Sequence, residues 1–594
     1  MCRIFGNFGG PAFGPDEIER LRSAQLAGGP DEQSQVTGPN WCLGGNRLAI
    51  QGLDGGAQPY RLGEVHAVFN GEIYNHDELR ADLRARGYRF SDHCDGTLIP
   101  ALYLEHGDRF VELLDGMFAI ALVDQRDRDR PRLLLANDPA GIKSLYYWSG
   151  NGDLVFSSEL PAMLALPRVP VTVLPAKVDL YLSMLTVLGA ETIFAGVRQL
   201  IPSSIVTVES GRAPRVAEYR TAITAPEPVA ELGKAGEQFR ELLDAEVQAM
   251  LRADVEVALI TSGGLDSSLL TAMATRHRPG VHAFNIAYKG NWPSDERAFA
   301  RQVADECGAT YHQVESDPAE FAGLLPEMVA QLGQPNAAPH CLSTYLLFRA
   351  VRDAGFKVAV AGEGADEMFG GYERFARAMQ GGSGWLDRYL DAMSPTPRSI
   401  RERIYSDGYR SLLAEVGAPS AEVRSIMAGF GDPPGLEDLL RYDQLERFPY
   451  YILRRTDHLS MASSVEVRVP FCQPKVVDFA RAAGQQLKIS DGKVKRTVYA
   501  AAEGLVPRSV LDRKKQPFTL PVGAMLRTGE PLFDFTREQL SYSESLYDYL
   551  DRPSVLGLLA EQAEQPSDAV AKSLWAILIL DLWLAGVASL QRAA

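Results

Sequence analysis

The sequence has few cysteines and no pair of them at metal-ligand spacing. Its 594 residues include six cysteines and nine histidines, and no two cysteines form a CxxC pair. This argues against a cysteine-based zinc site and against a disulfide framework. The first ten residues also lack the apolar core that a signal peptide needs. We therefore expect a cytoplasmic protein with free thiols.

The chain also lacks an excess of positive charge. It has 60 lysines and arginines against 76 aspartates and glutamates, which gives a formal net charge of −16. A sequence-independent nucleic-acid binder needs a basic face to neutralise phosphates, so we expect no nucleic-acid partner. The composition, 46% hydrophobic and 23% charged, is typical of a globular protein. Because a single core stops growing at about 250–300 residues, the length predicts two or more domains.

Long apolar runs are rare as well, and residues 574–590 form the run that comes nearest to a membrane-spanning helix. Asp581 lies in the middle of this run, where a charge is costly in lipid. We interpret the run as a buried C-terminal helix of a soluble domain, with a short spanning helix as the alternative. We therefore expect no membrane partner.

Short apolar segments dominate the first part of the chain, residues 1–210. They are separated by turn signals and interleaved with helical patterns, which predicts a layered α+β domain. The expected strands are Val65–Glu72, Phe118–Val123, Arg132–Ala136, Leu145–Trp148 and Leu154–Ser157, and the expected helices are His76–Arg86 and Leu98–His106.

A second domain is expected over residues 236–594, after a linker at 211–235 that contains glycine and prolines and shows little apolar periodicity. Apolar strands here alternate with helices, which predicts a parallel sheet, and ligands of such sheets bind beyond the carboxyl ends of the strands. Two glycine-rich turns follow two of these strands. The expected elements are the strands Val255–Thr261 and Lys357–Ala361 and the helices Gly236–Leu251 and Asp266–Arg276.

Cys2 is the most informative single residue, because it directly follows Met1. A residue this small allows Met1 to be trimmed, and Cys2 would then carry its own base. The free α-amino group has a pKa of about 7.7–8.0 and lies beside a thiol whose usual pKa is near 8.5. The amine can take the thiol proton and leave a thiolate nucleophile. The alternative is a small residue at the start of a buried strand, and Cys2 alone does not decide between the two.

The first glycine-rich turn reads SGGLDSS over residues 262–268, between an expected strand and an expected helix. Glycines let backbone N–H groups approach a phosphate, and the helix N-terminus favours the anion. Asp266 could hold Mg²⁺ beside it. The turn is not a Walker loop, but it resembles the pyrophosphate loop of ATP-pyrophosphatase enzymes, which form adenylates and release pyrophosphate.

The second turn, residues 362–372, reads GEGADEMFGGY and resembles the GEGxDExFGGY motif of asparagine synthetases. An acidic surface loop is the alternative. Residues 457–462 and 465–471 resemble two further segments of that family, in the same order. Lys495, followed by Arg513-Lys514-Lys515-Gln516, matches the segment with the family's catalytic lysine. On its own, a lysine in the Lys-rich run at 492–496 would more often be a solvated loop charge, and its spacing to residues 513–516 favours the functional interpretation.

The N-terminal part also resembles this family, in the glutaminase segments at 47–59 and 70–75. The resemblance implies that Arg47 pairs with the α-carboxylate of glutamine. It implies that the Asn70 side chain and the Gly71 N–H form an oxyanion hole. Glu72 would line the glutamine site, and Asp95 would hold the α-amino group.

The chain thus resembles glutamine-hydrolysing asparagine synthetases over nearly its whole length. The resemblance implies an N-terminal nucleophile hydrolase domain, an αββα sandwich, followed by an α/β parallel-sheet ATP-pyrophosphatase domain of the adenine nucleotide α-hydrolase-like class, with an ammonia tunnel between them. ATP and Mg²⁺ would be required, and a homodimer is possible. Glu363 would act as general base, Lys495 would stabilise negative charge, and Asp266 and Asp366 would hold the metal. The implied ATP-binding residues are Ser262, Gly263, Gly264, Asp266, Ser267, Ile286, Gly362 and Glu363.

Two departures from the family pattern concern the substrates. Residues 27–31 read AGGPD where the family has HRGPD, which affects how tightly the pocket closes over glutamine. Residues 334–343 do not match the stretch that helps bind aspartate in the bacterial enzyme. The ATP-handling residues are kept while the acceptor-facing ones differ, which favours an acceptor carboxylate other than aspartate, although aspartate stays open.

Two other functions remain as alternatives. One is a carboxylate-activating cyclase, resembling β-lactam synthetase, that has no glutaminase activity. Such relatives typically lack the N-terminal cysteine, and Cys2, Arg47 and Asn70 are all present here. The other is a non-enzymatic scaffold that has kept an enzyme fold, which the intact turns at 262–268 and 362–366 disfavour.

Overall fold

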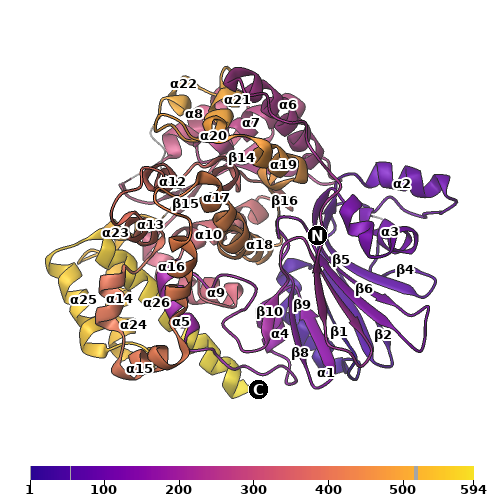
Figure 1. The fold of residues 1–594 in the computed structure, drawn as a ribbon, viewed down its shortest axis with the longest axis horizontal. Helices are drawn as coiled ribbons and strands as arrows, with labels where there is room; N and C mark the ends of the chain where they lie inside the picture. The colour runs from indigo at the N-terminus through magenta and orange to yellow at the C-terminus, as the bar shows by residue number, and fades with distance from the viewer. Residues whose placement is uncertain (1, 54, 294, 514–519, 594) are drawn as a thin grey trace.

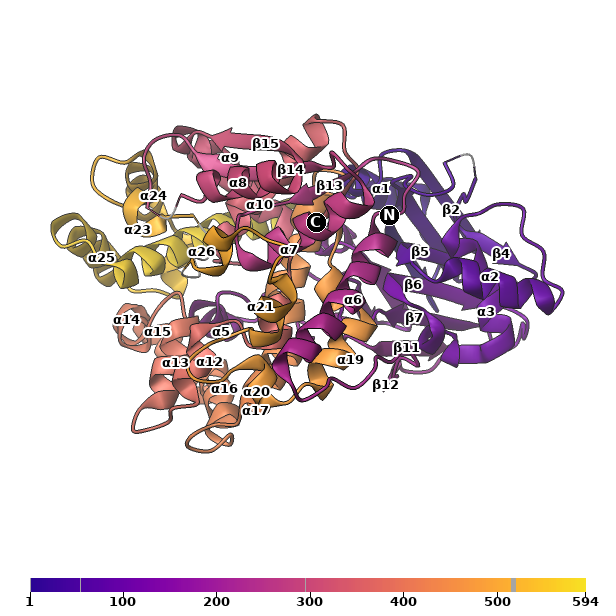
Figure 2. The ribbon, with the colours of Figure 1, turned by 90° about the horizontal axis from the view of Figure 1, so that it is seen from above.

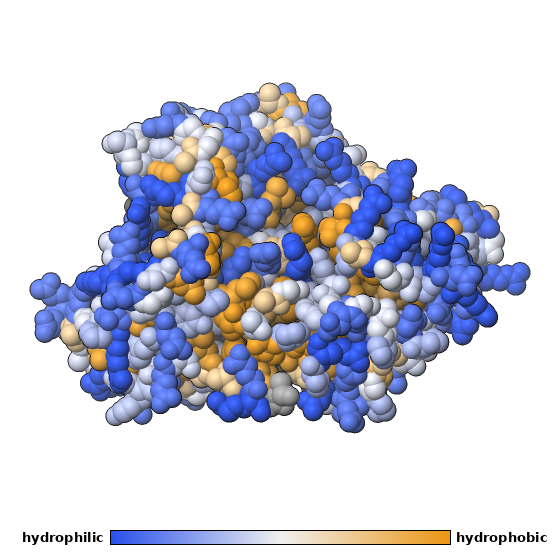
Figure 3. Space-filling view, turned by 60° about the horizontal axis from the view of Figure 1, so that its bottom comes forward, coloured by the Kyte–Doolittle hydropathy of each residue, from blue (hydrophilic) through white to orange (hydrophobic). Residues whose placement is uncertain are grey.

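The computed structural model describes residues 2–53, 55–293, 295–513 and 520–593. Figure 1 shows two β-sheets of the N-terminal part on one side of the molecule and a larger, mostly helical part on the other. The view from above in Figure 2 shows the same division, with α24 and α25 far from the N-terminal sheets. The face in Figure 3 is hydrophilic at its rim and has apolar side chains gathered in its hollowed middle.

The N-terminal part contains two six-stranded antiparallel sheets. The first has the strand order β10-β8-β9-β1-β3-β2 and the second β12-β11-β7-β6-β5-β4. The strands of the first sheet are β1 (Cys2–Phe8), β2 (Glu32–Gly38), β3 (Trp41–Arg47), β8 (Tyr146–Gly150), β9 (Asp153–Ser157) and β10 (Val197–Gln199). Those of the second are β4 (Tyr60–Leu62), β5 (Val65–Ile73), β6 (Gly116–Asp124), β7 (Arg132–Asn137), β11 (Ser204–Glu209) and β12 (Arg215–Glu218).

Alternation along β1 shows how the two sheets pack. Cys2, Ile4 and Phe8 lie in the apolar core between the sheets, together with Val68 of β5. Phe5 belongs to the core on the other face of the same sheet. Successive side chains of a strand point to opposite faces of the sheet, so the first residue of β1 lies on the inner face of the sandwich. A one-residue slip in register would move Cys2 out of it.

Helices cover the outer faces of both sheets, which confirms the predicted αββα sandwich. α2 (His76–Ala85) and α3 (Ile99–His106) pack on the second sheet, and α1 (Pro15–Ala24) and α4 (Leu160–Leu164) pack on the first. The strands and helices predicted here all form, with bounds shifted by one or two residues at most ends.

The segment predicted as a linker, 211–235, is more regular than expected. Residues Arg215–Glu218 form β12, which pairs with β11 at the edge of the second sheet, and α6 (Leu232–Met250) begins inside the segment. All four residues of β12 are exposed, so the strand carries no apolar pattern that marks it in the sequence. The division of the chain into domains at these residues stays a prediction.

The second part is built on a five-stranded parallel sheet, as predicted, with the strand order β15-β14-β13-β16-β17. β13 is its central strand and β16 lies beside it, and the two glycine-rich turns directly follow these two strands. The strands are β13 (Val257–Ile260), β14 (His282–Tyr288), β15 (Thr310–Ser316), β16 (Val358–Val360) and β17 (Glu466–Arg468). The helices of this layer are α6, α7 (Leu265–His277), α8 (Arg297–Cys307), α9 (Phe321–Leu332), α10 (His340–Asp353), α11 (Ala365–Phe369) and α18 (Arg454–Met461).

Helices also make up most of what remains. α5 (Lys177–Met184) belongs to the first part of the chain and packs against this helical region. A π-helix, η5 (Asp443–Leu453), runs directly into α18. The other helices are α12 (Glu373–Ala378), α13 (Trp385–Met393), α14 (Arg398–Ile404), α15 (Asp407–Val416), α16 (Pro419–Ala428), α17 (Leu436–Tyr442), α19 (Pro474–Ala482), α20 (Gln485–Lys488), α21 (Arg496–Ala502), α22 (Arg508–Leu511), α23 (Val522–Met525), α24 (Pro531–Tyr542), α25 (Arg552–Glu564) and α26 (Asp568–Ala593).

The apolar run near the C-terminus lies in α26, which is long and apolar enough to span a membrane but is 67% buried over its most apolar window. Residues 574–580 are all in the core, and Asp581 accepts a hydrogen bond from Ser543. The burial of α26 agrees with the predicted core helix.

Buried charges join the two parts of the chain. Arg3 of β1 is fully buried, and its Nη1 donates to Asp457 Oδ2 of α18 at 2.9 Å. Its Nε donates to Glu159 Oε1 at 2.7 Å, and Lys143 Nζ lies 3.4 Å from Asp457 Oδ1. Burial disfavours the charge on Asp457, but Arg3 and Lys143 outweigh it and lower its pKa to about 2. Asp457 is therefore the carboxylate on which this network depends.

Replacing Asp457 by asparagine will destabilise the protein by about 3–5 kcal/mol, because it leaves Arg3 and Lys143 buried without their main counter-charge. The parent's own acid sensitivity follows from the lowered pKa. The usual pKa of an aspartate is about 4. Ionised Asp457 therefore stabilises the protein fully above about pH 4, and this stabilisation is lost as the pH falls towards 2. Chemical denaturation of both proteins, at pH 7 and at steps down to pH 3, measures both effects.

Asp387→Asn is the matched control, because Asp387 pairs with Arg424 at the surface. Exposed pairs contribute about 0–1 kcal/mol. Equal losses of stability in the two variants would contradict the role given to Asp457.

Candidate active sites

The Cys2 thiol lies at the start of β1 and is 5% exposed. Gln58 Nε2 donates to its Sγ at 2.9 Å, and its backbone N donates to Asn70 Oδ1 at 3.2 Å. Burial raises the pKa of the thiol, while Arg47 and the backbone N–H of Leu48 oppose that rise. The resting thiol is therefore neutral, and a base has to remove its proton before it can attack.

Asn70 and Gly71 lie on β5 directly across from Cys2. The Asn70 side chain is fully buried, and its Nδ2 has no hydrogen-bond partner among the residues that the structure describes. A buried amide donor without a partner is rare and costly, and it is the group that a developing oxyanion needs. At Gly71 a Cβ would collide with the carbonyl oxygen of Met117 on β6, so glycine is required there. The geometry fits the predicted oxyanion hole.

Arg47 ends β3 and lies close enough to Cys2 for each to affect the other's pKa. Its Nη2 donates to the carbonyl oxygens of Gly52, at 2.8 Å, and Gln51, and its Nη1 lies 3.1 Å from Glu32 Oε2. The loop thus orients the guanidinium predicted to bind the α-carboxylate of glutamine. That role for Arg47 stays a prediction.

Asp95 and Glu72 are both buried beside the end of β5. Asp95 Oδ2 accepts from Ile73 N at 2.8 Å, and its Oδ1 accepts from Gly96 N at 2.8 Å. Glu72 Oε2 lies 3.4 Å from Arg468 Nη2 of β17, in the other part of the chain. Burial, and next the charge of Asp95, raise the pKa of Glu72 well above its usual range. The structure therefore places Glu72 between the two parts of the chain, and its predicted contact with glutamine is untested.

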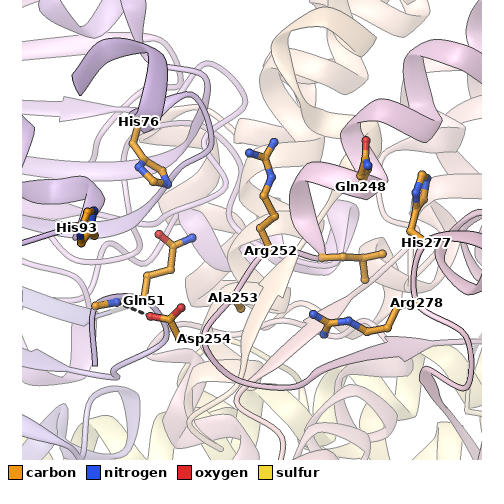
Figure 4. A pocket seen from close by; sticks show the side chains of 11 residues that line it. Gln51, His76, His93, Gln248, Arg252, Ala253, Asp254, His277 and Arg278 are labelled. Carbon is orange, nitrogen blue, oxygen red and sulfur yellow. Dashed lines mark hydrogen bonds between the residues drawn. The ribbon is translucent and has the colours of Figure 1, made fainter. Parts of the chain in front are cut away.

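A pocket of about 500 Å³ lies between the two parts of the chain (Figure 4). On one side are Gln51, His76 and His93, and on the other is the segment that connects α6 to β13. Asp254 in that segment bonds to the loop that holds Arg47. Its carboxylate accepts from Gly52 N at 2.8 Å, and its own N–H donates to Ile50 O at 3.0 Å. The side chain and the backbone of Asp254 thus each hold the loop through one hydrogen bond.

The turn at residues 262–268 leads from β13 into α7, as predicted. Gly264 N donates to Ser262 Oγ at 3.2 Å, and Ser262 N donates to Ser267 Oγ at 3.1 Å. Gly263 has φ +71°, and a Cβ there would collide with the backbone of Phe299 and Ala300. The turn is therefore built with backbone N–H groups at a helix N-terminus, a suitable cradle for phosphate.

Lys495 joins the two glycine-rich turns. Its Nζ lies 2.6 Å from Asp266 Oδ2 of the first turn and 2.6 Å from Asp366 Oδ1 of the second. The lysine is 3% exposed, and burial lowers its pKa, but the two carboxylates outweigh burial and raise it overall. Its backbone is left-handed, with φ +48°, and Gly371 has no room for a Cβ against Lys495 and Asp366. The interpretation of Lys495 as a solvated loop charge is wrong.

Glu363 and Ile286 complete the predicted set. Glu363 follows β16; its Oε1 accepts from Thr456 Oγ1 at 3.4 Å and lies 3.5 Å from Arg455 Nη2. A Cβ at Gly362 would lie within 3.5 Å of Asp266 and Ser267, so the two glycine-rich turns are in contact there. Ile286 is buried near the carboxyl end of β14, the strand beside β13. Residues 514–516 of the predicted lysine segment lie outside the described residues.

The carboxylates of Asp266 and Asp366 suit Mg²⁺. They converge on one cation, the ammonium of Lys495, and Mg²⁺ is usually bound by one or two carboxylates together with substrate phosphates. The described residues contain no cluster of three or more possible metal ligands. The protein alone thus offers a site that phosphate oxygens would have to complete.

Comparison with known families gives the relationship of the chain. Residues 238–585 match the family model of asparagine synthase, and residues 1–220 match that of a glutamine amidotransferase domain. The chain belongs to the asparagine synthase family.

Curated relatives of this asparagine synthase family member match over most of its length. It is 27% identical over 95% of the chain to asparagine synthetase [glutamine-hydrolyzing] 1 of Bacillus subtilis, covering 93% of that protein. It is 30% identical over 98% to a putative asparagine synthetase of Mycobacterium tuberculosis, covering 97% of it. It is also 25% identical over 80% to amidase chry2 of Gibberella zeae, covering 79% of that protein. A solved B. subtilis glutamine phosphoribosylpyrophosphate amidotransferase covers 52% of the chain at 14% identity and a TM-score of 0.27.

Three residues of this asparagine synthase family member contact the candidate sites without having been predicted. Gln58 bonds to the Cys2 thiol and also holds Phe69 of β5 through two hydrogen bonds. Arg468 reaches Glu72, and Asp254 fastens the Arg47 loop. Gln58 and Arg468 lie inside motifs that the sequence displays, so position in a motif was an available signal. Asp254 lies in no motif, and only the fold reveals it.

Proposed function

We propose that this chain hydrolyses glutamine at Cys2 and uses the ammonia to amidate a carboxylate that it activates with ATP. The observation that carries the proposal is the Lys495 bridge between Asp266 and Asp366, at the carboxyl edge of a parallel sheet. The buried thiol beside an unpaired amide donor supports the other half of the reaction. Membership of the asparagine synthase family agrees with both.

The glutaminase step needs a base for a neutral thiol. After removal of Met1, the α-amino group of Cys2 takes the thiol proton, and Sγ attacks the side-chain carbonyl carbon of glutamine. Asn70 Nδ2 and the Gly71 N–H donate to the oxyanion. The carbon–nitrogen bond breaks, the nitrogen receives the proton from the amine, and ammonia leaves. Water then hydrolyses the thioester to glutamate and restores the thiol.

The synthetase step takes place at the two glycine-rich turns. An acceptor carboxylate oxygen attacks the α-phosphorus of ATP, and pyrophosphate leaves. Asp266 and Asp366 would hold Mg²⁺, which offsets phosphate charge when bound. Ammonia then attacks the acyl carbon, Glu363 takes a proton from the nitrogen, and AMP leaves. Lys495 donates to the negative charge that develops in both steps.

The acceptor differs from aspartate in this proposal, because residues 334–343 depart from the family pattern. Aspartate is the competing acceptor, because several relatives are named asparagine synthetases and amidation of aspartate gives asparagine. We further propose a cytoplasmic enzyme, active alone or as a homodimer. The buried α26 supports the absence of a membrane anchor within the described residues.

A screen of carboxylic acids tests the proposed function. The protein is incubated with ATP, Mg²⁺ and ammonium chloride together with one acid at a time, and pyrophosphate is measured. We expect release that depends on both ATP and one class of acid, with aspartate included for comparison. No release above background with any acid, including aspartate, would contradict the synthetase assignment.

A further inference from the structure

Arg3 is a fully buried arginine that directly follows the candidate nucleophile Cys2. Its Nε donates to Glu159 Oε1 at 2.7 Å. Its Nη1 donates to Asp457 Oδ2 at 2.9 Å, and its Nη2 donates to the Asp457 carbonyl oxygen at 3.2 Å. One guanidinium thus joins the N-terminal part to α18 in the other part of the chain. The planar fork of an arginine suits these three bonds, whereas a lysine ammonium is a compact point charge.

The first residues of β1 have strand pairing on one side. Pairing with β9 begins at Phe5, so β3 is the one described strand that pairs with Cys2 and Arg3. In the proposed mechanism Cys2 is also the first residue of the chain, and chain ends are poorly ordered unless they are tied down. Cys2 and Ile4 lie in the core between the sheets. Arg3 therefore points to the opposite face of β1 and holds this end of the strand from that side.

Gly28 lies against the Arg3 side chain. A Cβ at Gly28 would lie 2.5 Å from Arg3 Cγ and 2.8 Å from its Nε, which is too close in both cases. Both are side-chain atoms, so a larger residue fits at position 28 only where residue 3 is small. Residues 27–31 read AGGPD where the family has HRGPD, so a glycine stands here in place of an arginine. The Arg3 guanidinium thus lies in the space that a side chain at position 28 would occupy.

The segment at residues 27–31 lies where the two parts of the chain meet. Ser464, which follows α18, donates from its hydroxyl to the carbonyl oxygen of Ala27. Lys357 Nζ, just before β16, lies 2.7 Å from Asp31 Oδ2. The same oxygen accepts, at 2.8 Å, from a backbone N–H of the loop that follows β3. The segment therefore contacts both the synthetase part and the loop of the glutaminase site.

We propose that Arg3 is a positioning residue of the glutaminase site, and that its guanidinium replaces the arginine that position 28 lacks. It fixes the first residues of β1 against Asp457 and so sets where the Cys2 thiol lies relative to the oxyanion hole. The inference rests on the proposed function, because it requires Cys2 as the nucleophile. Arg3 acts through Cys2 and not on glutamine itself, because it lies on the face of β1 opposite the thiol.

Arg3→Lys tests the positioning role in a protein that keeps the buried charge. The lysine cannot hold Glu159 and Asp457 as the planar fork does, so the thiol is placed less well. We expect kcat for glutamine hydrolysis to fall about 10- to 100-fold, the cost of misplacing a reacting group by about 1 Å. The KM for glutamine and the rate of amidation with ammonium chloride will stay close to parent values. A role in folding alone would not separate kcat from KM in this way.

Exchange of the two side chains tests the shared space. Arg3→Ser will lose glutamine hydrolysis and melt at a lower temperature than the parent, because Asp457 and Glu159 lose a buried partner. Arg3→Ser/Gly28→Arg returns a guanidinium to them from position 28, and its kcat for glutamine hydrolysis will be at least about 5-fold above that of Arg3→Ser. Arg3→Ser/Gly28→Met fills the same space without a charge. It is the matched control and will stay at the level of Arg3→Ser.

The parent's own glutamine hydrolysis separates this inference from the proposed function. If the parent hydrolyses glutamine and Arg3→Lys has the parent's kcat, this inference alone is overturned. Equal glutamine hydrolysis in the two double variants overturns it as well. Higher activity with Gly28→Arg than with Gly28→Met supports it, even where Arg3→Ser alone does not fold. A parent that hydrolyses no glutamine would refute the proposed function together with this inference.

Discussion

Cys2→Ala will lose glutamine-dependent amide formation by at least about 10³-fold and keep ammonia-dependent amide formation at the parent rate. Alanine is as small as cysteine, so Met1 is still removed and the amine is still present. Only the nucleophile is missing, and no thioester can form. Product amide is measured with glutamine and, separately, with ammonium chloride as the nitrogen source.

Cys307→Ala is the matched control for the loss of a thiol, because Cys307 is partly exposed at the end of α8. It will keep both activities. Glutamine-dependent activity in Cys2→Ala equal to that of the parent would show that the nucleophile has been misassigned. Loss of both activities would show that Cys2 acts through folding.

Lys495→Ala will lower acceptor-dependent pyrophosphate release about 10²- to 10³-fold with either nitrogen source. The substitution removes the charge that stabilises the reacting phosphate, and it leaves Asp266 and Asp366 facing each other without their shared cation. Glutamine hydrolysis at Cys2 will continue, because that site lies in the other part of the chain. Pyrophosphate and glutamate are measured in the same reactions.

Lys493→Ala provides the control at the synthetase site. Lys493 is exposed, two residues before Lys495, and it has the same side chain. It will retain parent activity. Parent-like pyrophosphate release by Lys495→Ala would remove the catalytic role, and an equal loss in Lys493→Ala would indicate a loop effect.

Local patterns were enough to predict the elements that place both sites. Residues 255–276 predicted a strand, a turn and a helix, and the structure has them as β13, the turn and α7. The apolar stretch at 65–72 predicted β5, which carries Asn70 and Gly71. These predictions succeed because each depends on residues that are neighbours in the chain.

Contacts between distant segments could not be predicted in this way. Arg3 and Asp457 are 454 residues apart, and nothing beside either residue identifies its partner. The same holds for Glu72 with Arg468 and for Asp254 with the Arg47 loop.

The edge strand β12 shows a different limit. It falls within the predicted linker, and all its side chains are exposed. A strand that buries no side chain has no apolar alternation, so backbone pairing with β11 is the only signal of its presence. Composition there indicated a linker but could not indicate the conformation of these residues.

The central claim is that glutamine hydrolysis at Cys2 supplies the nitrogen for a carboxylate activated at Lys495. The most direct measurement is the ratio of glutamate to pyrophosphate formed with glutamine, ATP, Mg²⁺ and the acid that the screen identifies. The account predicts equal amounts of the two products, with pyrophosphate absent when the acid is omitted. Pyrophosphate formed at the same rate without the acid, or without any transfer of the glutamine amide nitrogen to it, would contradict the account.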